Sequence, residues 1–291
     1  YQAVFTSPSP QLFPNGCVFI LLLCATAVFI MESRIPKTLT FSNVFSIGNS
    51  AQLGVEEMLE YLDETYENGK SSNIKILYIE SIKDPDKLLK HASSLVRKGC
   101  HVAAIKSGGS EAGSRAASSH TGALASSDLA VDALFRKAGI VRCYGREELS
   151  TVASIFMHPE IKGKQIAIIT HAGGPAVMLT DALSQGGLNI PAIEGHEADE
   201  LLTHLYPGSS VSNPIDILAT GTAEQVGIVI DYCDKKFDNI DAMMVIFGST
   251  GLNEVFDVYE VIHQKMKTCT KPIFPILPSV NNARKEVEDF L

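Results

Sequence analysis

Short apolar runs alternate with amphipathic segments along most of this chain. Ile74–Ile79 and Val102–Ile105 have the length and composition of buried strands, whereas Leu53–Glu64 and Pro85–Arg97 carry apolar residues at helical spacing. Asp84 is placed to cap the second of these helices. Strands and helices at such short intervals predict βαβ units, and therefore parallel sheets with ligands bound at the carboxyl ends of the strands.

The same pattern continues through the rest of the chain. Further strands are predicted at Val18–Leu23, Val44–Ile47, Ile140–Tyr144, Gln165–Thr170, Leu188–Ile193, Ala242–Phe247 and Pro272–Leu277. Further helices are predicted at Ala25–Ser33, Leu124–Phe135, Arg146–Phe156, Ala176–Gln185, His196–Leu205, Ala223–Cys233, Asn253–Met266 and Asn281–Leu291. The last helix has no strand after it, so we expect the series to be truncated there.

The polar, Pro- and Gly-containing segment His158–Lys164 divides the pattern into two series. A length of 291 residues also fits two domains. We therefore expect two doubly wound α/β domains with parallel sheets, one over residues 1–160 and one over residues 161–291.

One segment, Cys17–Met31, is apolar enough to raise the question of a membrane. It has 15 uncharged residues, fewer than the roughly 20 that span a bilayer, and no basic region precedes it. A membrane anchor is one interpretation. The other, which we favour, is a buried strand that runs into a buried helix, as in the interior of a parallel sheet.

Composition and charge narrow the classes of function. The formal net charge is −9 and no dense cluster of Lys and Arg appears, which argues against a nucleic-acid partner. The six cysteines include no C-x-x-C pair and no His at metal-ligand spacing, so neither a zinc site nor a disulfide framework is indicated, and no metal ligands are assigned. A reducing, cytoplasmic location fits this pattern.

The segment Lys106–Gly122 is the strongest candidate for chemistry. Four glycines, five serines and His120 lie between a predicted strand and a predicted helix. Glycines let a charged group approach the main chain, and a helix N-terminus offers free N–H groups to an anion such as phosphate. The alternative is an ordinary strand-to-helix loop in which His120 caps or packs.

Two further positions could contribute to a phosphate site. Glu80 follows a buried strand, where a carboxylate needs a partner such as an imidazole N–H or a helix N-terminus. The loop His171–Pro175 places Gly173 and Gly174 before a helix, which makes a second N-terminus suited to an anion. A solvated Glu80 and a plain tight turn are the corresponding structural alternatives.

A family resemblance connects these positions. Six segments carry it, in this order: F-S-N-V-F-S-I-G-N-S (Phe41–Ser50), I-L-Y-I-E (Ile76–Glu80), K-S-G-G-S-E-A-G-S-R-A-A-S-S-H-T-G-A-L-A (Lys106–Ala125), K-A-G-I-V (Lys137–Val141), A-I-I-T-H-A-G-G-P (Ala167–Pro175) and N-P-I-D (Asn213–Asp216). Together they resemble the ADP-forming acyl-CoA (acetyl-CoA) synthetases of the succinyl-CoA synthetase superfamily, whose domains are flavodoxin-like. The resemblance runs from about residue 41 to about residue 280.

The resemblance implies an acid–CoA ligase that interconverts acyl-CoA, ADP and phosphate with acid, CoA and ATP. His120 matches the histidine that becomes phosphorylated, and Glu80 matches the carboxylate that orients it. Gly122, Gly173 and Gly174 match phosphate-binding positions. CoA, ATP or ADP and Mg²⁺ are the implied cofactors, and a small acid is the implied substrate.

The chain also departs from the family pattern. Between Val18 and Ala27 it reads I-L-L-L-C-A where the family has a Ser-Gln-Ser-Gly turn that opens another phosphate-binding helix. The family's CoA-binding domain and ATP-grasp module are not recognisable here, so we expect an ATP-grasp subunit or domain as a partner. A regulatory or non-catalytic relative that keeps the fold and binds a partner is the alternative.

Overall fold

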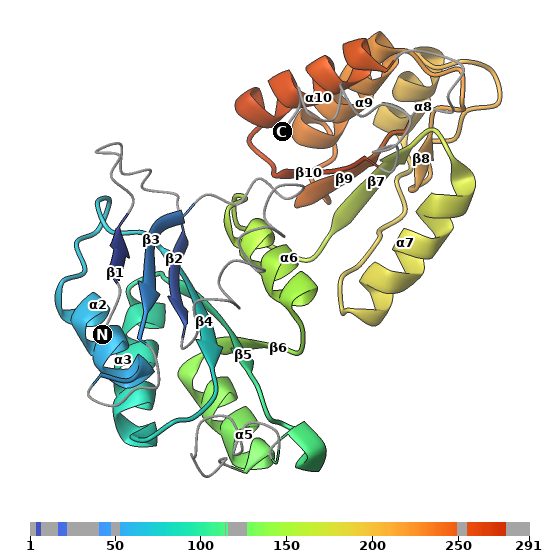
Figure 1. The fold of residues 1–291 in the computed structure, drawn as a ribbon. Helices are drawn as coiled ribbons and strands as arrows, with labels where there is room; N and C mark the ends of the chain where they lie inside the picture. The colour runs from blue at the N-terminus through green and yellow to red at the C-terminus, as the bar shows by residue number, and fades with distance from the viewer. Residues whose placement is uncertain are drawn as a thin grey trace. The chain divides into compact units, whose positions relative to one another are not determined.

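The computed structural model of the chain describes residues 4–6, 17–21, 41–47, 53–113, 115, 127–248 and 255–277. The chain divides into two compact units, Tyr1–His158 and Pro159–Leu291, each with its own sheet (Figure 1). The predicted helices Ala25–Ser33 and Asn281–Leu291 lie outside the described residues.

The first unit contains a six-stranded sheet in the order β1-β3-β2-β4-β5-β6. Its strands are β1 (Val4–Thr6), β2 (Cys17–Leu21), β3 (Phe41–Ser46), β4 (Ile74–Ile79), β5 (His101–Lys106) and β6 (Ile140–Cys143). The five strands β2 to β6 pair in parallel in the order β3-β2-β4-β5-β6, which is the strand order of the doubly wound flavodoxin-like fold. The three-residue β1, which the pattern did not predict, pairs antiparallel with β3 at the edge, so the sheet is not parallel throughout.

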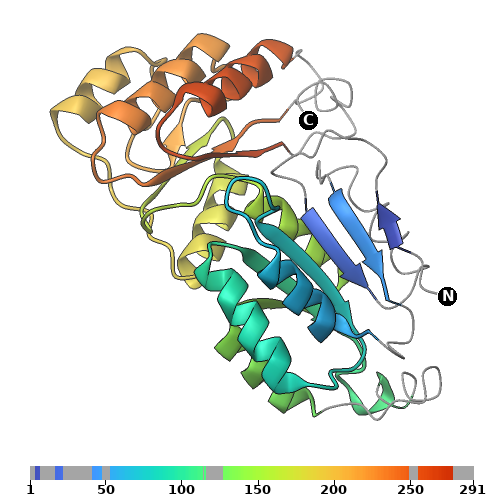
Figure 2. The ribbon, with the colours of Figure 1, turned by 90° about the vertical axis from the view of Figure 1, so that its left-hand side faces the viewer.

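Helices cover both faces of this sheet. They are α2 (Val55–Glu64), α3 (Pro85–Arg97), α5 (Asp128–Ala138) and α6 (Arg146–Phe156). Along β5, Val102 and Ala104 pack in the cluster that contains α2, α3 and α5, whereas Ala103 and Ile105 pack against α6. Successive residues of a strand point to opposite faces, so an apolar run buried on both sides gives this arrangement. Figure 2 shows α2 and α3 together on one face.

The apolar segment near the amino terminus supplies a central strand. Cys17, Val18 and Ile20 of β2 are buried, and β2 lies between β3 and β4. The structure therefore contains the strand predicted at Val18–Leu23, although the end of that range lies outside the described residues. No helix in the described part of the chain is long and apolar enough to cross a membrane.

The second unit contains a four-stranded parallel sheet in the order β10-β9-β7-β8. The strands are β7 (Ile166–Thr170), β8 (Ile215–Asp216), β9 (Ala242–Ile246) and β10 (Ile273–Ile276). The helices are α7 (Gly173–Gln185), α8 (His196–Thr203), α9 (Ala223–Lys235) and α10 (Phe256–Thr268). Ala167 and Ile169 pack in the core with α8, α9 and α10, and Ile168 packs with α7 on the other face (Figure 1).

The strand predicted at Leu188–Ile193 is wrong. Within that range only Asn189 makes a β-bridge, an isolated parallel one to Gln165, the residue before β7. The Asn213 side chain takes the place of a strand on this edge: its Oδ1 accepts a hydrogen bond from Ile168 N, and its Nδ2 donates to the carbonyl oxygens of Ile166 and Pro191, all at 2.9 Å. The strand that pairs with β7 is instead the two-residue β8, which the pattern did not predict.

Three predicted helix starts shift by three residues or more. α5 begins at Asp128, after Ser127 as N-cap, and α10 begins at Phe256 rather than Asn253. α7 begins at Gly173 and not at Ala176. It starts early because the Thr170 hydroxyl accepts a hydrogen bond from Ala172 N at 2.9 Å, which turns the chain directly into the helix.

Candidate functional site

The carboxyl edge of the first unit has the geometry of a ligand site. β2 and β4 are neighbours, but the chain leaves them toward opposite sides of the sheet, to β3 and to β5. In doubly wound folds ligands bind outside the strands at such a switch point. Glu80 follows β4 directly and is half-buried, as expected for a side chain at this edge.

Lys106, the last residue of β5, lies beside Glu80. Its Cα pairs with that of Ile79, and Ser107 N donates to the Ile79 carbonyl at 2.9 Å. The Lys106 side chain is 5% exposed, and its Nζ donates to the Ser107 carbonyl at 2.6 Å. Burial lowers the pKa of Lys106, and the positive charge of Arg142 adds to this effect, whereas the negative charges of Asp128 and Glu80 oppose it.

An ion pair joins β6 to the start of α5, where the loop that leaves β5 ends. Arg142 of β6 donates from Nη2 to Asp128 Oδ1, and from Nη1 to the Asp128 carbonyl at 3.3 Å. Gly109 lies against this pair: a Cβ added there would be 2.7 Å from Asp128 Oδ1. Gly108 adopts φ +73°, which favours glycine. The pair thus fixes the start of α5, and the Asp128 carboxylate leaves no room for a side chain at Gly109.

His120 and Gly122 lie on the stretch between these two ends, and both are outside the described residues. The structure therefore places Glu80 and the two ends of the predicted loop. The roles assigned to His120 and Gly122 stay predictions.

In the second unit, the loop after β7 opens a helix N-terminus to solvent. Gly173 and Gly174 are the first two residues of the thirteen-residue α7, and both are exposed. A Cβ at Gly174 would meet no atom within 4 Å, and one at Gly173 would lie 3.8 Å from Asp216 Oδ2. The Asp216 carboxylate is held by Leu218 N, which donates to Oδ1 at 2.8 Å. The free N–H groups of α7 are accessible to an anion.

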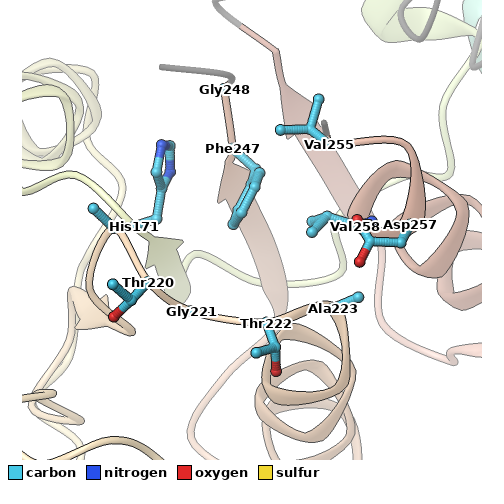
Figure 3. Close-up of a pocket in the computed structure, with 11 residues that line it drawn as sticks. His171, Thr220, Gly221, Thr222, Ala223, Phe247, Gly248, Val255, Asp257 and Val258 are labelled. Atoms are coloured by element: carbon cyan, nitrogen blue, oxygen red, sulfur yellow. Dashed lines mark hydrogen bonds between the residues drawn. The ribbon is translucent and has the colours of Figure 1, made fainter. Parts of the chain in front are cut away.

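A pocket of about 200 Å³ lies at the carboxyl ends of β7 and β9 (Figure 3). Apolar and polar side chains share its wall, and it is lined by His171, Ala219, Thr220, Gly221, Thr222, Ala223, Phe247, Gly248, Val255, Asp257 and Val258. Thr222 caps α9 reciprocally with Gln225, so this part of the wall is rigid.

His171 is held in a defined orientation at this pocket. Its Nδ1 is 3.3 Å from the Ile246 carbonyl oxygen, and its ring lies 4.4 Å from the Phe247 ring. A carbonyl only accepts, so Nδ1 carries the proton of this bond, and Nε2 of the neutral ring is left as an acceptor. Sequence reasoning identified the loop but not this role of His171, because the Ile246 carbonyl comes from a strand 75 residues away.

Burial makes several of the described cysteines poor nucleophiles. In the part of the chain that the structure describes, five cysteines are free, and burial raises the pKa of the Cys17, Cys143 and Cys233 thiols to about 12. Within the described ranges, no group of three or more His, Cys, Asp or Glu side chains could hold a metal ion.

Comparisons with known proteins give the family of the chain. Residues 23–156 match the family model described as succinyl-CoA ligase like flavodoxin domain. The chain is 36% identical over 210 residues to the alpha subunit of acetate–CoA ligase [ADP-forming] II of Pyrococcus furiosus, and this alignment covers 72% of this chain and 45% of the relative. It is 32% identical over 268 residues to acetate–CoA ligase [ADP-forming] I of Archaeoglobus fulgidus, and that alignment covers 92% of this chain and 38% of the relative.

Solved structures share the fold. The dinucleotide forming acetyl-coenzyme A synthetase 1 of Ca. Korarchaeum cryptofilum, in complex with phosphate and ADP, superimposes with a TM-score of 0.83 at 22% identity. The match covers 94% of this chain and 58% of that one. The chain thus spans less than half the length of the two curated relatives described above.

Proposed function

Since the chain belongs to the succinyl-CoA synthetase superfamily and is related to its ADP-forming acid–CoA ligases, we propose that it forms part of such a ligase. The reaction interconverts acyl-CoA, ADP and phosphate with acid, CoA and ATP. A phosphohistidine at His120 carries the phosphoryl group between the two halves of the reaction. The single observation that supports this most is the position of Glu80 at the switch point of the first sheet, next to the strand from which the His120 loop departs.

Glu80 orients the nucleophile in this proposal. A carboxylate that accepts the N–H of one ring nitrogen fixes the tautomer, and the other nitrogen is then free to attack phosphorus. The carboxylate also stabilises the positive charge that develops on the imidazole.

We propose Gly122 of the first unit, and Gly173 and Gly174 of the second, as phosphate-binding residues. The open N-terminus of α7 supports this role for Gly173 and Gly174, because both residues are exposed and no atom lies within 4 Å of a Cβ added at Gly174. The pocket at His171 is large enough for a small acid and offers both apolar contacts and a polar ring nitrogen. It is our candidate for the acid substrate or its phosphate.

The remaining cofactors and partners follow from the relatives. We assign CoA, the adenine nucleotide and its Mg²⁺ mainly to parts of the enzyme beyond this chain, with an ATP-grasp subunit or domain as the partner. The P. furiosus relative is named as an alpha subunit, which supports a partner subunit. Free cysteines in the described part of the chain support a cytoplasmic location.

The test is to map the phosphorylated residue. The full-length protein, combined with its nucleotide-binding subunit where that is a separate chain, is incubated with radiolabelled ATP. We expect acid-labile label on His120, none in His120→Asn, and normal labelling in the control His196→Asn, whose side chain is exposed on α8. Glu80→Gln should slow labelling by about 10²–10⁴-fold, the usual contribution of such a group.

Two results would contradict the proposal. Label on another histidine would refute the assignment of His120. A chain that stays unlabelled beside an active partner would support the regulatory alternative.

A further inference from the structure

A buried histidine, His91, lies between α2 and α3, the two helices that share one face of the first sheet (Figure 2). Its side chain is 4% exposed, and its Nδ1 lies 2.9 Å from Asp63 Oδ2 of α2. The Asp63 carboxylate, which Lys98 Nζ also binds at 2.8 Å, only accepts hydrogen bonds. Nδ1 of His91 therefore carries a proton.

The other ring nitrogen of His91 faces a second carboxylate of α2. Its Nε2 is buried and lies 3.5 Å from Glu60 Oε1, and no group in the described part of the chain donates a hydrogen bond to it. In a neutral ring with the proton on Nδ1, Nε2 would be an acceptor facing an acceptor oxygen, and a buried acceptor without a donor costs free energy. A second proton, on Nε2, makes the ring a donor to both carboxylates.

The charges around the ring favour the same second proton. α2 presents three carboxylates to α3, and two ammonium groups at the ends of α3 lie within 3.2 Å of them. The carboxylates belong to Glu57, Glu60 and Asp63, and the ammonium groups to Lys87 and Lys98. An imidazolium at His91 balances the third negative charge.

α3 also packs on α5 and on the strands beneath it. The charged side chains of those elements are paired elsewhere or exposed: Lys75 donates to the Ser72 carbonyl, Lys106 donates to the Ser107 carbonyl, Asp128 and Asp132 bind Arg142, Arg136 binds Asp132, and Lys137 is exposed. Among the described residues, the charged groups in contact with the His91 ring are thus Glu60 and Asp63.

We propose that His91 is a proton switch between α2 and α3: with both ring nitrogens protonated it joins Asp63 to Glu60, and loss of the Nε2 proton breaks the link to Glu60. The two carboxylates lie beside the ring only in the folded protein, so the folded state holds this proton more tightly than the unfolded chain. The resulting stability is present at low pH, as long as the carboxylates stay ionised, and is lost as the pH rises through the titration of folded His91.

The helices that the switch joins flank the loop that begins at Glu80. Glu56, buried in the first turn of α2, accepts hydrogen bonds from Lys83 N at 2.6 Å and from Asp84 N at 3.2 Å, and Asp84 is the N-cap of α3. α2 thus binds this loop through Glu56 and binds α3 itself through the switch. None of these contacts depends on phosphoryl transfer, so the inference stands apart from the proposed function.

The first measurement is an NMR titration of the histidine Cε1–H signals in the full-length protein, with His91 assigned by its loss in His91→Asn, or in His91→Gln if the first variant does not fold. Glu60→Gln removes the second carboxylate, so we expect His91 to lose its proton at a pH lower by about one unit. The matched control is Glu64→Gln, because Glu64 is exposed on the same helix and should leave this pH unchanged. The His101 ring, which stacks on Phe156, should titrate identically in every variant.

The second measurement is urea unfolding at two pH values. Glu60→Gln also loses the ion pair with Lys87, 2.6 Å long, but that loss is the same at both pH values because Lys87 stays charged. Relative to wild type, the ratio of folded to unfolded protein should therefore fall about tenfold more at about pH 5.5 than at about pH 9, which corresponds to one unit in the titration of His91. In Glu64→Gln the ratio relative to wild type should be the same at both.

Either of two results overturns the inference. One is a His91 ring that loses its proton at the same pH in wild type and in Glu60→Gln; if no histidine signal moves in Glu60→Gln, this holds without an assignment. The other is a loss of stability in Glu60→Gln that does not differ between the two pH values, because Glu60 would then act through Lys87 alone.

Discussion

Removing the Asn213 side chain should destabilise the second unit strongly, although Asn213 lies in an irregular segment. Its amide satisfies the N–H of Ile168 and the carbonyls of Ile166 and Pro191. Ile166 and Ile168 are fully buried, so water cannot replace these bonds. Each buried group left without a partner costs roughly 1–3 kcal/mol.

The choice of substitution separates two causes. Asn213 has φ +65°, a left-handed conformation that glycine adopts freely and alanine does not. Asn213→Gly therefore removes the hydrogen bonds without straining the backbone, and we expect a loss of about 2–6 kcal/mol in the free energy of unfolding, the sum for the two buried strand groups. Asn213→Ala should lose about 1–2 kcal/mol more, because its backbone is also strained.

Hydrogen exchange followed by mass spectrometry, together with urea unfolding, is the assay. Exchange of β7 peptides that contain Ile168 should accelerate in Asn213→Gly, while peptides of β4 in the other unit keep their rate. The control is Asn239→Ala, because the exposed Asn239 makes one longer bond, 3.3 Å to the Ala192 carbonyl. If the glycine variant loses no more stability than Asn239→Ala, the side chain does not replace a strand in the way that we describe.

Two other predictions concern the first unit. Gly109→Ala would force a Cβ to 2.7 Å from Asp128 Oδ1, so thermal unfolding should show a loss of about 1–3 kcal/mol in stability. Gly145→Ala meets no atom within 4 Å, but Gly145 is the N-cap of α6, where alanine is less favourable than glycine, so we expect a smaller loss of about 0.5–1 kcal/mol there. Burial opposes ionisation of Asp63, but hydrogen bonds from Lys98, Ser94 and His91 outweigh it and lower the pKa. The stability that ionised Asp63 contributes to the fold is present above its unfolded pKa of about 3.9 and is lost as the pH falls through its lower folded pKa. Lys98→Met removes one of these hydrogen bonds, so unfolding followed by circular dichroism should show a smaller loss of stability on acidification than in the wild type.

The elements that local chemistry determines could be predicted from the sequence. The α3 helix starts at Pro85, and its Asp84 cap accepts a hydrogen bond from Lys87 N, as the side-chain pattern indicates. β4 spans Ile74–Ile79 as predicted, because a run of that length that is apolar apart from Lys75 suits a strand buried on both faces. The position of Glu80 after it follows from the same pattern.

The elements and contacts that depend on distant residues could not be predicted. β8 has two residues, and its place beside β7 depends on Asn213, whose partner Ile168 is 45 positions away in the chain. Pro191 lacks an N–H, so the apolar run around it could not supply a full strand. The surroundings of Lys106 and His171 were missed for the same reason, because their partners come from other strands and helices.

The arrangement of charges suggests why a carboxylate suits the end of β4. A glutamate there would be protonated or turned to solvent if the site held only apolar side chains, and it could not then accept an imidazole N–H. Lys106 ends the next strand, where burial lowers the pKa of its ammonium and the negative charges of Asp128 and Glu80 oppose that effect. Arg142 holds the start of α5 through Asp128. Cations and carboxylates from three elements thus meet at the edge of the sheet where Glu80 is proposed to orient the imidazole.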